Sequence, residues 1–334
     1  MSRKDATIAD IAKRVNMTTI TVSRALNKPD QVKPATLERI LEVARELNYV
    51  PNAFARSLKR SESRIIGVVV ASVGNPFYSD MIKAISREAR RHGYTTMLVD
   101  TDETQAQETR AVETLLSYRV AGIILSPASD EPDYQPAYVE PLRSGNTPVV
   151  FLDRTLHDTP FSRVVLDNYH SGRKTAGYLL QQERLPRQVL LLTGPAQSRI
   201  SMERLKGVRE VLAEQDMELI IRVGDYTLEP AYRSTLQWLD DNPPPDAILG
   251  FNQLITLGAM RALRERGIAH RSLVLCGIDP LPFGDILGVP VACVAHDASL
   301  AGSSAVRLLL EHLEDPTKPR VKVVIPGELL HGSV

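Results

Sequence analysis

The sequence predicts an α/β protein in two parts: an all-helical N-terminal head that contains a helix-turn-helix, and a larger body of two α/β subdomains. Two patterns support this prediction. In the first 50 residues, apolar positions recur at helical spacing over short segments. From residue 65 onward, continuous apolar runs alternate with helical stripes, which is typical of a parallel sheet covered by helices.

The segment 7–27, TIADIAKRVNMTTITVSRALN, predicts two short helices with a tight junction. Thr7 with Asp10 matches the capping box that starts a helix, and the Thr18 hydroxyl can cap the second helix. The apolar residues that would face inward are Ile8, Ile11, Ala12 and Val15 in the first helix and Val22, Ala25 and Leu26 in the second. Two short helices joined in this way predict a helix-turn-helix.

The outward face of the second predicted helix is polar apart from one β-branched apolar residue. It consists of Thr19, Ile20, Ser23, Arg24 and Asn27. Such a face suits a DNA major groove, where polar side chains meet base edges and an apolar side chain meets a thymine methyl. The alternative is a helical hairpin that merely packs on another part of the protein, because two-helix apolar patterns are common.

A third helix is predicted to begin near Lys33-Pro34, because proline is favoured in the first turn of a helix. Its apolar stripe consists of Leu37, Ile40, Leu41, Ala44 and Leu47. Residues 52–59 follow Pro51 and are too few to form a stable helix alone in water. This stretch is either an ordinary linker or a segment that folds only when DNA or a partner assists it.

Charge is distributed unevenly along a chain whose 40 basic and 40 acidic residues balance. Residues 1–64 hold 13 Lys/Arg against 7 Asp/Glu, whereas the remaining 270 residues hold 27 against 33. A basic head on an acidic body fits a polyanion-binding module joined to a part that has no such partner.

Other features exclude several protein classes. Cys276 and Cys293 lie in apolar stretches without a metal-ligand spacing, so we expect buried free thiols. No signal-peptide core begins the chain and no run approaches about 18 apolar residues, so we expect a cytoplasmic protein with no membrane partner. No phosphate loop, Gly-x-Ser-x-Gly or His-Glu-x-x-His occurs. We therefore expect no catalytic residue, metal site or cofactor.

The body predicts two similar α/β subdomains. Strands are expected at 65–71, 95–100, 121–126, 148–153, 188–193, 218–223, 247–251, 273–277 and 291–295. Helices are expected at 75–93, 106–118, 169–182, 203–215, 230–240, 254–266 and 299–313. The chain would cross between the subdomains near 153–167. Ligands of such folds bind outside the carboxyl ends of the strands, so a cleft between the subdomains is the expected binding site.

Six motifs in order resemble those of the lac repressor (LacI/GalR) family of bacterial transcription regulators. They are IADIAKRV-x-MTTITVSRALN, YVPNAFARSLKRSESRIIGVVV, NPFYSDMIKAI, FLDR, GP-x8-R-x-x-G and GIDP. The resemblance covers the whole chain and implies a periplasmic-binding-protein-like core, a homodimer and a hinge helix that inserts a leucine into the minor groove. It implies a head at 1–51, a hinge helix and linker at 52–64, and an effector-binding core at 65–334, with a second crossing near 279–297.

The resemblance also implies the DNA contacts. Thr19, Ile20 and Arg24 would read bases, while Thr21 and Ser23 would meet phosphates. Together with the hinge, the expected contacts are Thr7, Thr18, Thr19, Ile20, Thr21, Ser23, Arg24, Asn27, Asn52, Ala55, Arg56, Leu58 and Lys59. Leu58 would be the apolar wedge, at a cost offset by the contacts that a kinked groove permits. The partner would be pseudo-palindromic double-stranded operator DNA.

The effector contacts implied by the same resemblance are Asn75, Phe77, Tyr78, Ser126, Asp153, Arg154, Arg204, Tyr226, Asn252 and Asp279. Aromatic rings surrounded by Asp, Asn and Arg suit a polyhydroxylated ligand, so the implied effector is a sugar, sugar acid or sugar phosphate. As alternatives, the two aspartates would only cap turns, and Arg204 would form a structural ion pair.

The sequence departs from the family pattern at three places. Gln253 stands where the family usually has an aspartate, His296 stands where glutamine is frequent, and residues 198–200 lie in a segment that varies with the ligand. The chain ends at VVIPGELLHGSV without a leucine-heptad helix, so we expect a dimer instead of a tetramer. A periplasmic binding protein would lack the basic head, and an architectural DNA protein would lack the cleft, so the regulator interpretation is favoured.

Overall fold

The computed structural model describes residues 6–50, 63–284 and 291–331. The chain separates into two compact units between Ser63 and Arg64, and each unit is described by itself. The predicted hinge helix at 52–59 lies outside the described residues. Within those residues, no helix combines the length and apolar character needed to cross a bilayer.

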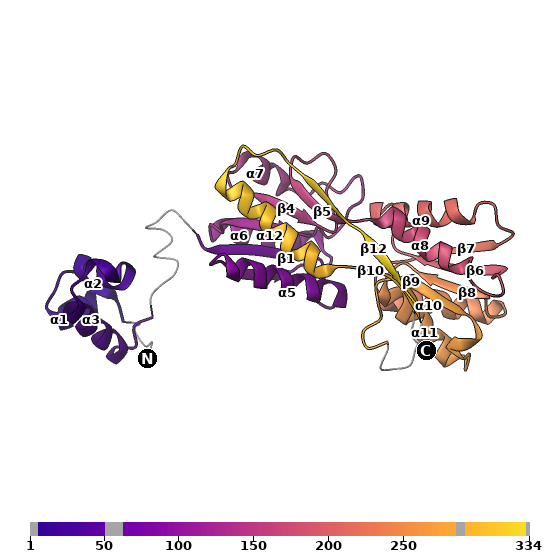
Figure 1. Cartoon of the computed structure of the whole chain (residues 1–334), viewed down its shortest axis with the longest axis horizontal. Helices are drawn as coiled ribbons and strands as arrows, with labels where there is room; N and C mark the ends of the chain where they lie inside the picture. Colours follow the sequence, from indigo (N-terminus) through magenta and orange to yellow (C-terminus); the bar gives the residue numbers. More distant parts are fainter. Residues whose placement is uncertain (1–5, 51–62, 285–290, 332–334) are drawn as a thin grey trace. The chain divides into compact units, whose positions relative to one another are not determined.

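The head consists of three α-helices: α1 (Ile8–Val15), α2 (Thr19–Asn27) and α3 (Pro34–Glu46), with a 3-10 turn at Pro29–Gln31 (Figure 1). The predicted capping box is confirmed, because the Thr7 side chain accepts from the backbone of Asp10 while the Asp10 carboxylate accepts from the backbone of Thr7. Thr18 caps α2 as predicted. One prediction is wrong: Leu41 does not belong to the core, since it is 39% exposed.

The first subdomain of the body contains a six-stranded sheet in the order β11-β5-β4-β3-β1-β2. Its strands are β1 (Ile65–Val70), β2 (Thr95–Asp100), β3 (Gly122–Leu125), β4 (Val149–Leu152), β5 (Ser162–Leu166) and β11 (Lys322–Ile325). Its helices are α5 (Pro76–Arg91), α6 (Gln105–Ser117), α7 (Val139–Ser144) and α12 (Ala298–Glu314). All five strand pairs are parallel.

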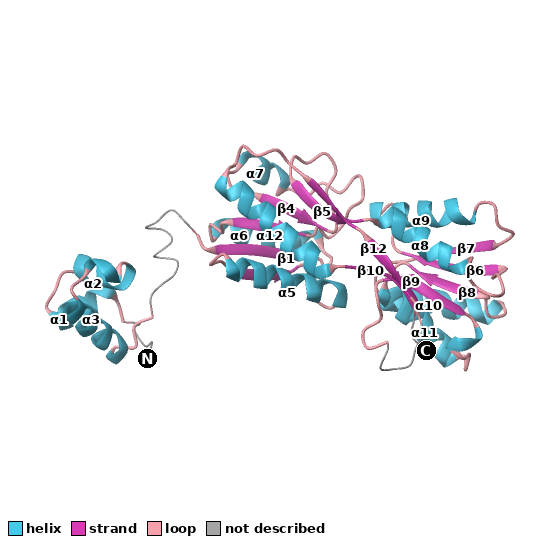
Figure 2. Ribbon diagram, viewed as in Figure 1, coloured by secondary structure: helices cyan, strands magenta, loops and turns pink. Residues whose placement is uncertain are grey.

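The second subdomain repeats this plan with the sheet order β12-β10-β9-β8-β6-β7 (Figure 2). Its strands are β6 (Gln188–Thr193), β7 (Glu218–Val223), β8 (Ala247–Gly250), β9 (Val274–Ile278), β10 (Ala292–His296) and the antiparallel β12 (Gly327–Leu330). Its helices are α8 (Asn168–Leu179), α9 (Arg199–Leu212), α10 (Leu228–Asp241) and α11 (Gln253–Glu265), with a 3-10 turn at His270–Ser272.

Helices cover both faces of the first sheet, which explains the uninterrupted apolar runs in its strands. Val68 and Val70 on β1 pack in a core with residues of α5 and α12. Val69, between them in sequence, packs in a separate core with residues of α6 and α7. Alternate residues of one strand therefore enter two cores.

The chain crosses between the subdomains three times. The first crossing follows β5, because α8 packs on the second sheet, and another lies between β10 and α12. They fall at the ends of the two ranges in which crossings were predicted, 153–167 and 279–297. A third crossing at Pro326, between β11 and β12, was not predicted. The prediction also omitted the strands β5, β11 and β12 and the short helix α7. Three connections run between the subdomains beside the cleft.

Both cysteines are free and buried, as predicted. Burial raises the pKa of the Cys293 thiol to about 11 and raises that of Cys276 further. Both thiols are therefore protonated at neutral pH and unreactive toward oxidants or metals.

Candidate functional site

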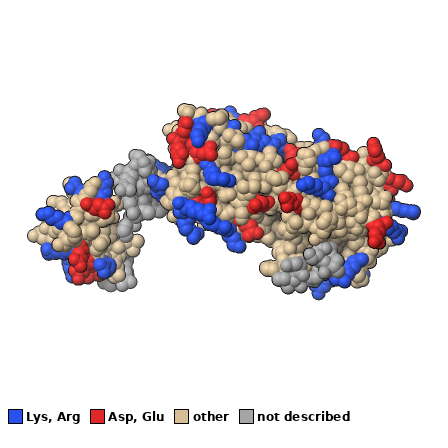
Figure 3. Space-filling model, viewed as in Figure 1, with Lys and Arg blue, Asp and Glu red and all other residues tan. Residues whose placement is uncertain are grey.

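The outward face of α2 presents Thr19, Ile20 and Arg24 to solvent. Ile20 is 69% exposed although it is a large apolar side chain. Val22 and Ala25 on the opposite face are buried against α1 and α3, so the helix cannot rotate to hide Ile20. Basic side chains lie at several places on the visible face of the head (Figure 3).

Three of the other predicted DNA contacts have local structural roles. Thr7 and Thr18 cap α1 and α2, and the Asn27 side chain donates to the backbone oxygen of Ser23 at 2.7 Å. Thr21 and Ser23 are half-buried. The hinge contacts Asn52, Ala55, Arg56, Leu58 and Lys59 lie outside the described residues.

In the body, one cleft between the subdomains collects nine of the ten residues predicted to bind the effector. Its lining consists of Asn75, Phe77, Tyr78, Asp153, Arg154, Ile200, Arg204, Tyr226, Asn252 and Asp279. The tenth, Ser126, is buried and does not line the cleft itself, but its hydroxyl lies 3.1 Å from that of the lining residue Tyr78. Residues from the strand ends of both subdomains therefore meet here, as the fold requires.

Asp153 and Asp279 occupy equivalent places in the two subdomains. Each follows a strand, β4 or β9, and each has a positive φ, 67° for Asp153 and 66° for Asp279. Each backbone N–H donates to a carbonyl of the next strand in the sheet, from Val164 or Val294, at 2.9 Å. Among the described residues, neither carboxylate accepts a hydrogen bond from the turn that follows it. This backbone geometry directs two buried carboxylates into one cleft.

The Asp153 carboxyl group is strongly influenced by burial. Desolvation raises its pKa to about 6, although Arg154, Arg204 and a 3.0 Å hydrogen bond from the Tyr78 hydroxyl favour the charged form. Burial, followed by the charge of Asp153, also raises the pKa of Tyr78. Tyr78 is therefore a neutral donor, and Asp153 is ionised at pH 7 but close to titration.

Arg154 is buried and joins several segments. Its guanidinium group donates to the backbone oxygen of Ala128 and to Glu103, which is 3.2 Å away. The guanidinium carbon also lies 5.2 Å from the ring centroid of Tyr226 in the other subdomain. This cation–π contact links the two sides of the cleft.

Arg204 is buried on α9 and is held by uncharged acceptors. Its Nε donates to Oδ1 of Asn168 at 2.8 Å, and Nη1 donates to the backbone oxygen of Phe251. Among the described residues it forms no salt bridge, so the alternative of a structural ion pair is not supported. Its guanidinium group keeps further N–H donors for the cleft.

Tyr226 and Asn252 complete the second wall. The Tyr226 hydroxyl lies 2.6 Å from Oγ of Ser198 and 2.7 Å from that of Ser201. Asn252 caps α11 and donates to the backbone oxygen of Tyr226 at 2.9 Å. The Asn252 amide therefore has a structural role in addition to its place in the cleft.

Direct contacts hold the subdomains together. Oδ2 of Asp130 accepts from the backbone N–H of Ile200 at 3.0 Å, and the Gln253 amide lies 3.2 Å from Oδ1 of Asn75. The side chains leave a cavity of only about 30 Å³ at the cleft. Pockets for small molecules usually measure roughly 300–1,000 Å³, so a ligand can enter only when the lining side chains or the subdomains move apart.

Sequence reasoning missed three residues of this region. Ile200 lines the cleft from the first turn of α9, in a segment whose ligand contacts varied too much to predict. Asp130 and Glu103 come from loops, and their partners Ile200 and Arg154 lie 70 and 51 positions away. No local pattern marks such long-range pairs.

Comparison with known proteins matches both units of the chain. Residues 7–52 match the model of bacterial regulatory proteins of the lacI family, and residues 66–317 match that of a periplasmic binding protein domain. The ribose operon repressor of Halalkalibacterium halodurans is 30% identical over 97% of this chain and 95% of its own length. The transcriptional repressor CytR of Escherichia coli is 29% identical over 92% of this chain and 90% of its own.

A solved structure extends the match to three dimensions. The lac repressor dimer bound to operator and an anti-inducer superposes with a TM-score of 0.81 at 27% identity. The superposition covers 98% of this chain and 99% of that chain.

Proposed function

Because the chain belongs to the lacI family of bacterial regulatory proteins, we propose that its body binds a sugar, sugar acid or sugar phosphate that controls operator binding by its head. The chain is a DNA-binding transcriptional repressor controlled by a small-molecule effector, and its relatives are regulators rather than enzymes. The observation that most strongly supports the effector site is the convergence of nine predicted residues on one cleft. We propose a cytoplasmic homodimer as the working form.

The chemistry of the cleft suits a hydroxylated ligand. Carboxylates of Asp153 and Asp279 accept hydrogen bonds from hydroxyl groups, while Arg204 donates to them. Phe77 and Tyr78 line the cleft and meet edge-on with ring centroids 5.4 Å apart, and aromatic rings of this kind can pack on the apolar C–H face of a sugar ring. Hydrogen-bond acceptors and donors for the hydroxyl groups of a sugar therefore lie together in the cleft.

Effector binding would change the spacing of the subdomains. A ligand that parts the subdomains would loosen the contacts between them, such as that between Asp130 and Ile200 and that between Arg154 and Tyr226. The first subdomain begins at β1, only a few residues after the proposed hinge. Movement of that subdomain would reposition the hinges of a dimer, and both hinges must fit one operator.

The DNA-binding site would combine the exposed face of α2 with the hinge at 52–59. Leu58→Ala should weaken specific operator binding more than binding to random DNA, because only a specific complex inserts an apolar wedge between base steps. Equal losses on both kinds of DNA would mean that residues 52–59 are an ordinary linker.

A screen of sugars, sugar acids and sugar phosphates by thermal shift tests the function as a whole. A ligand that binds only the folded state raises its stability by mass action. The same compound should change operator affinity in a gel-shift assay, and deletion of residues 1–60 should abolish operator binding while preserving the thermal shift, because head and body have separate cores. Loss of the thermal shift on deletion would contradict the assignment of the effector to the body.

A further inference from the structure

A second pocket adjoins the cleft and contains an unusual pair of cations. Arg163 on β5 and Lys322 on β11 are register partners in a parallel strand pair, so their side chains leave the sheet on the same face. Like charges placed side by side on neighbouring strands are destabilising. Within residues 63–284 and 291–331, no hydrogen bond or ion pair joins either side chain to an acidic group. Neither cation of the pair therefore has a direct ion-pair partner among the described residues.

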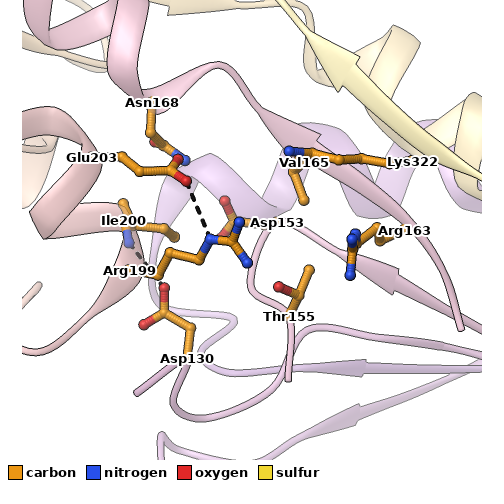
Figure 4. Close-up of a pocket in the computed structure, with 10 residues that line it drawn as sticks. All are labelled: Asp130, Asp153, Thr155, Arg163, Val165, Asn168, Arg199, Ile200, Glu203 and Lys322. Carbon is orange, nitrogen blue, oxygen red and sulfur yellow. Dashed lines mark hydrogen bonds and ion pairs between the residues drawn. The ribbon is translucent and has the colours of Figure 1, made fainter. Parts of the chain in front are cut away.

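A third cation faces the same space from the other subdomain. Arg199, the first residue of α9, lines the pocket together with Arg163 and Lys322. Its Nε donates to Glu203 at 3.1 Å, which leaves the terminal N–H groups of the guanidinium without a partner among the described residues. In Figure 4, Arg199 and Arg163 lie on either side of Thr155, and the Lys322 side chain extends over the same space.

The Thr155 hydroxyl supplies an independent observation. Thr155 lines this pocket and is only 4% exposed as a residue, and its hydroxyl forms no hydrogen bond with any residue that the structure describes. The hydroxyl oxygen is not one of the fully buried atoms, so it is open to the pocket. An uncommitted hydroxyl between two arginines is suited to an oxygen atom of a ligand.

Three acidic residues also line this pocket, and each accepts a hydrogen bond within the protein. Asp130 accepts from the backbone of Ile200, Glu203 accepts from Arg199, and Asp153 accepts from the Tyr78 hydroxyl. Asp153 and Ile200 line both this pocket and the cleft. The two spaces are therefore neighbours.

We propose that the effector is a hydroxylated small molecule with a terminal oxyanion, and that Arg163, Lys322, Arg199 and the Thr155 hydroxyl bind this oxyanion. This inference rests on the proposed function and narrows the effector to acidic compounds. Arginine donates paired N–H groups to phosphate or carboxylate oxygens, and lysine adds a point charge. The hydroxylated part of the molecule then reaches Asp153 and the cleft.

Inorganic phosphate and acetate, titrated calorimetrically into the full-length protein at constant ionic strength, are the probes. Saturable binding of either ion is expected, and the ion that binds more tightly distinguishes a phosphorylated effector from a carboxylic one. The double variant Arg163→Gln/Lys322→Gln should bind that ion about tenfold or more weakly, because it loses charged hydrogen bonds. Thr155→Val should weaken it less, and the proposal is wrong if neither ion binds or if the double variant binds equally well.

A matched control removes two charges elsewhere. Arg110→Gln/Arg209→Gln changes two exposed helical arginines outside the pocket and should leave ion binding unchanged. An equal loss in this control would mean that binding reflects net charge only and would refute the proposal.

The variant Arg204→Ala distinguishes failure of this inference from failure of the proposed function. If a neutral sugar releases DNA from the wild-type protein but not from Arg204→Ala, and neither phosphate nor acetate binds, only the inference about the oxyanion is refuted. If phosphate or acetate binds at the cationic pocket but the effector still acts on Arg204→Ala, only the assignment of the effector to the cleft is refuted.

Discussion

The close packing of α8 on α9 predicts opposite effects for two glycine substitutions in the same helix. A Cβ on Gly172 would lie 2.1 Å from the backbone oxygen of Arg204, so the two helices would have to separate. A Cβ on Gly177 would meet nothing within 4 Å. Gly207, the last residue of the GP-x8-R-x-x-G motif, makes the reciprocal contact, since its Cβ would lie 2.2 Å from the backbone oxygen of Tyr169.

The magnitudes follow from two opposing terms. Replacing glycine by alanine inside a helix stabilises it by about 1 kcal/mol. Overpacking of a tight contact costs roughly 1–3 kcal/mol, and a contact with rigid backbone belongs at the upper end of that range. Gly177→Ala should therefore raise the free energy of unfolding by about 1 kcal/mol. Gly172→Ala should lower it by about 2 kcal/mol, the difference between the two terms.

Urea denaturation followed by circular dichroism measures both values. Effector binding adds a second measurement, because displacement of α9 moves Arg204 and should weaken effector binding only in Gly172→Ala. Equal stabilisation by the two substitutions, or unchanged effector affinity in Gly172→Ala, would refute the argument that this helix contact positions Arg204.

Three further predictions concern the cleft, the DNA-binding face and the assembly. Burial raises the Asp153 pKa from its usual value near 4 to about 6, so the stability that this group contributes is present below about pH 4 and is lost as the pH rises through about 6. Relative to wild type, the unfolding free energy of Asp153→Asn should therefore increase by on the order of 3 kcal/mol between about pH 4 and 7. A difference between variant and wild type that does not change with pH would contradict this prediction. Ile20→Ala should leave the unfolding free energy within about 0.5 kcal/mol of wild type, because Ile20 is 69% exposed, yet weaken specific operator binding roughly tenfold in fluorescence anisotropy. Unchanged operator affinity would remove Ile20 from the interface. Sedimentation at micromolar concentration should show a dimer, and a stable tetramer would contradict the proposed homodimer.

The sequence predicted those features that depend on local pattern. The Thr7–Asp10 capping box, the inward stripe of α1 and the continuous apolar strand of β1 are all encoded within a few residues. The cleft residues were predicted from the resemblance to the lac repressor family, whose motifs place residues such as Asp153 directly after a strand.

The missed features depend on distant parts of the chain. β11 and β12 are four residues each and are separated only by Pro326, so neither shows a clear period, and each is stabilised as a strand by pairing with another segment. α9 begins four residues before its predicted start, where the Ser198 side chain caps its first turn. The pairing of Arg163 with Lys322 joins residues 159 positions apart and becomes visible only in the folded sheet.

The central claim is that effector binding in the cleft and operator binding by the head are energetically coupled. If the effector changes operator affinity by a given factor, operator DNA must change effector affinity by the same factor, because the linkage is reciprocal. The decisive measurement is calorimetric titration of the effector into the full-length protein with and without saturating operator, beside the operator affinity with and without effector. We predict equal factors in wild type and a factor of one in Arg204→Ala, which should keep its operator affinity in the absence of effector. Effector binding that is identical with and without operator in the wild-type protein would contradict the account.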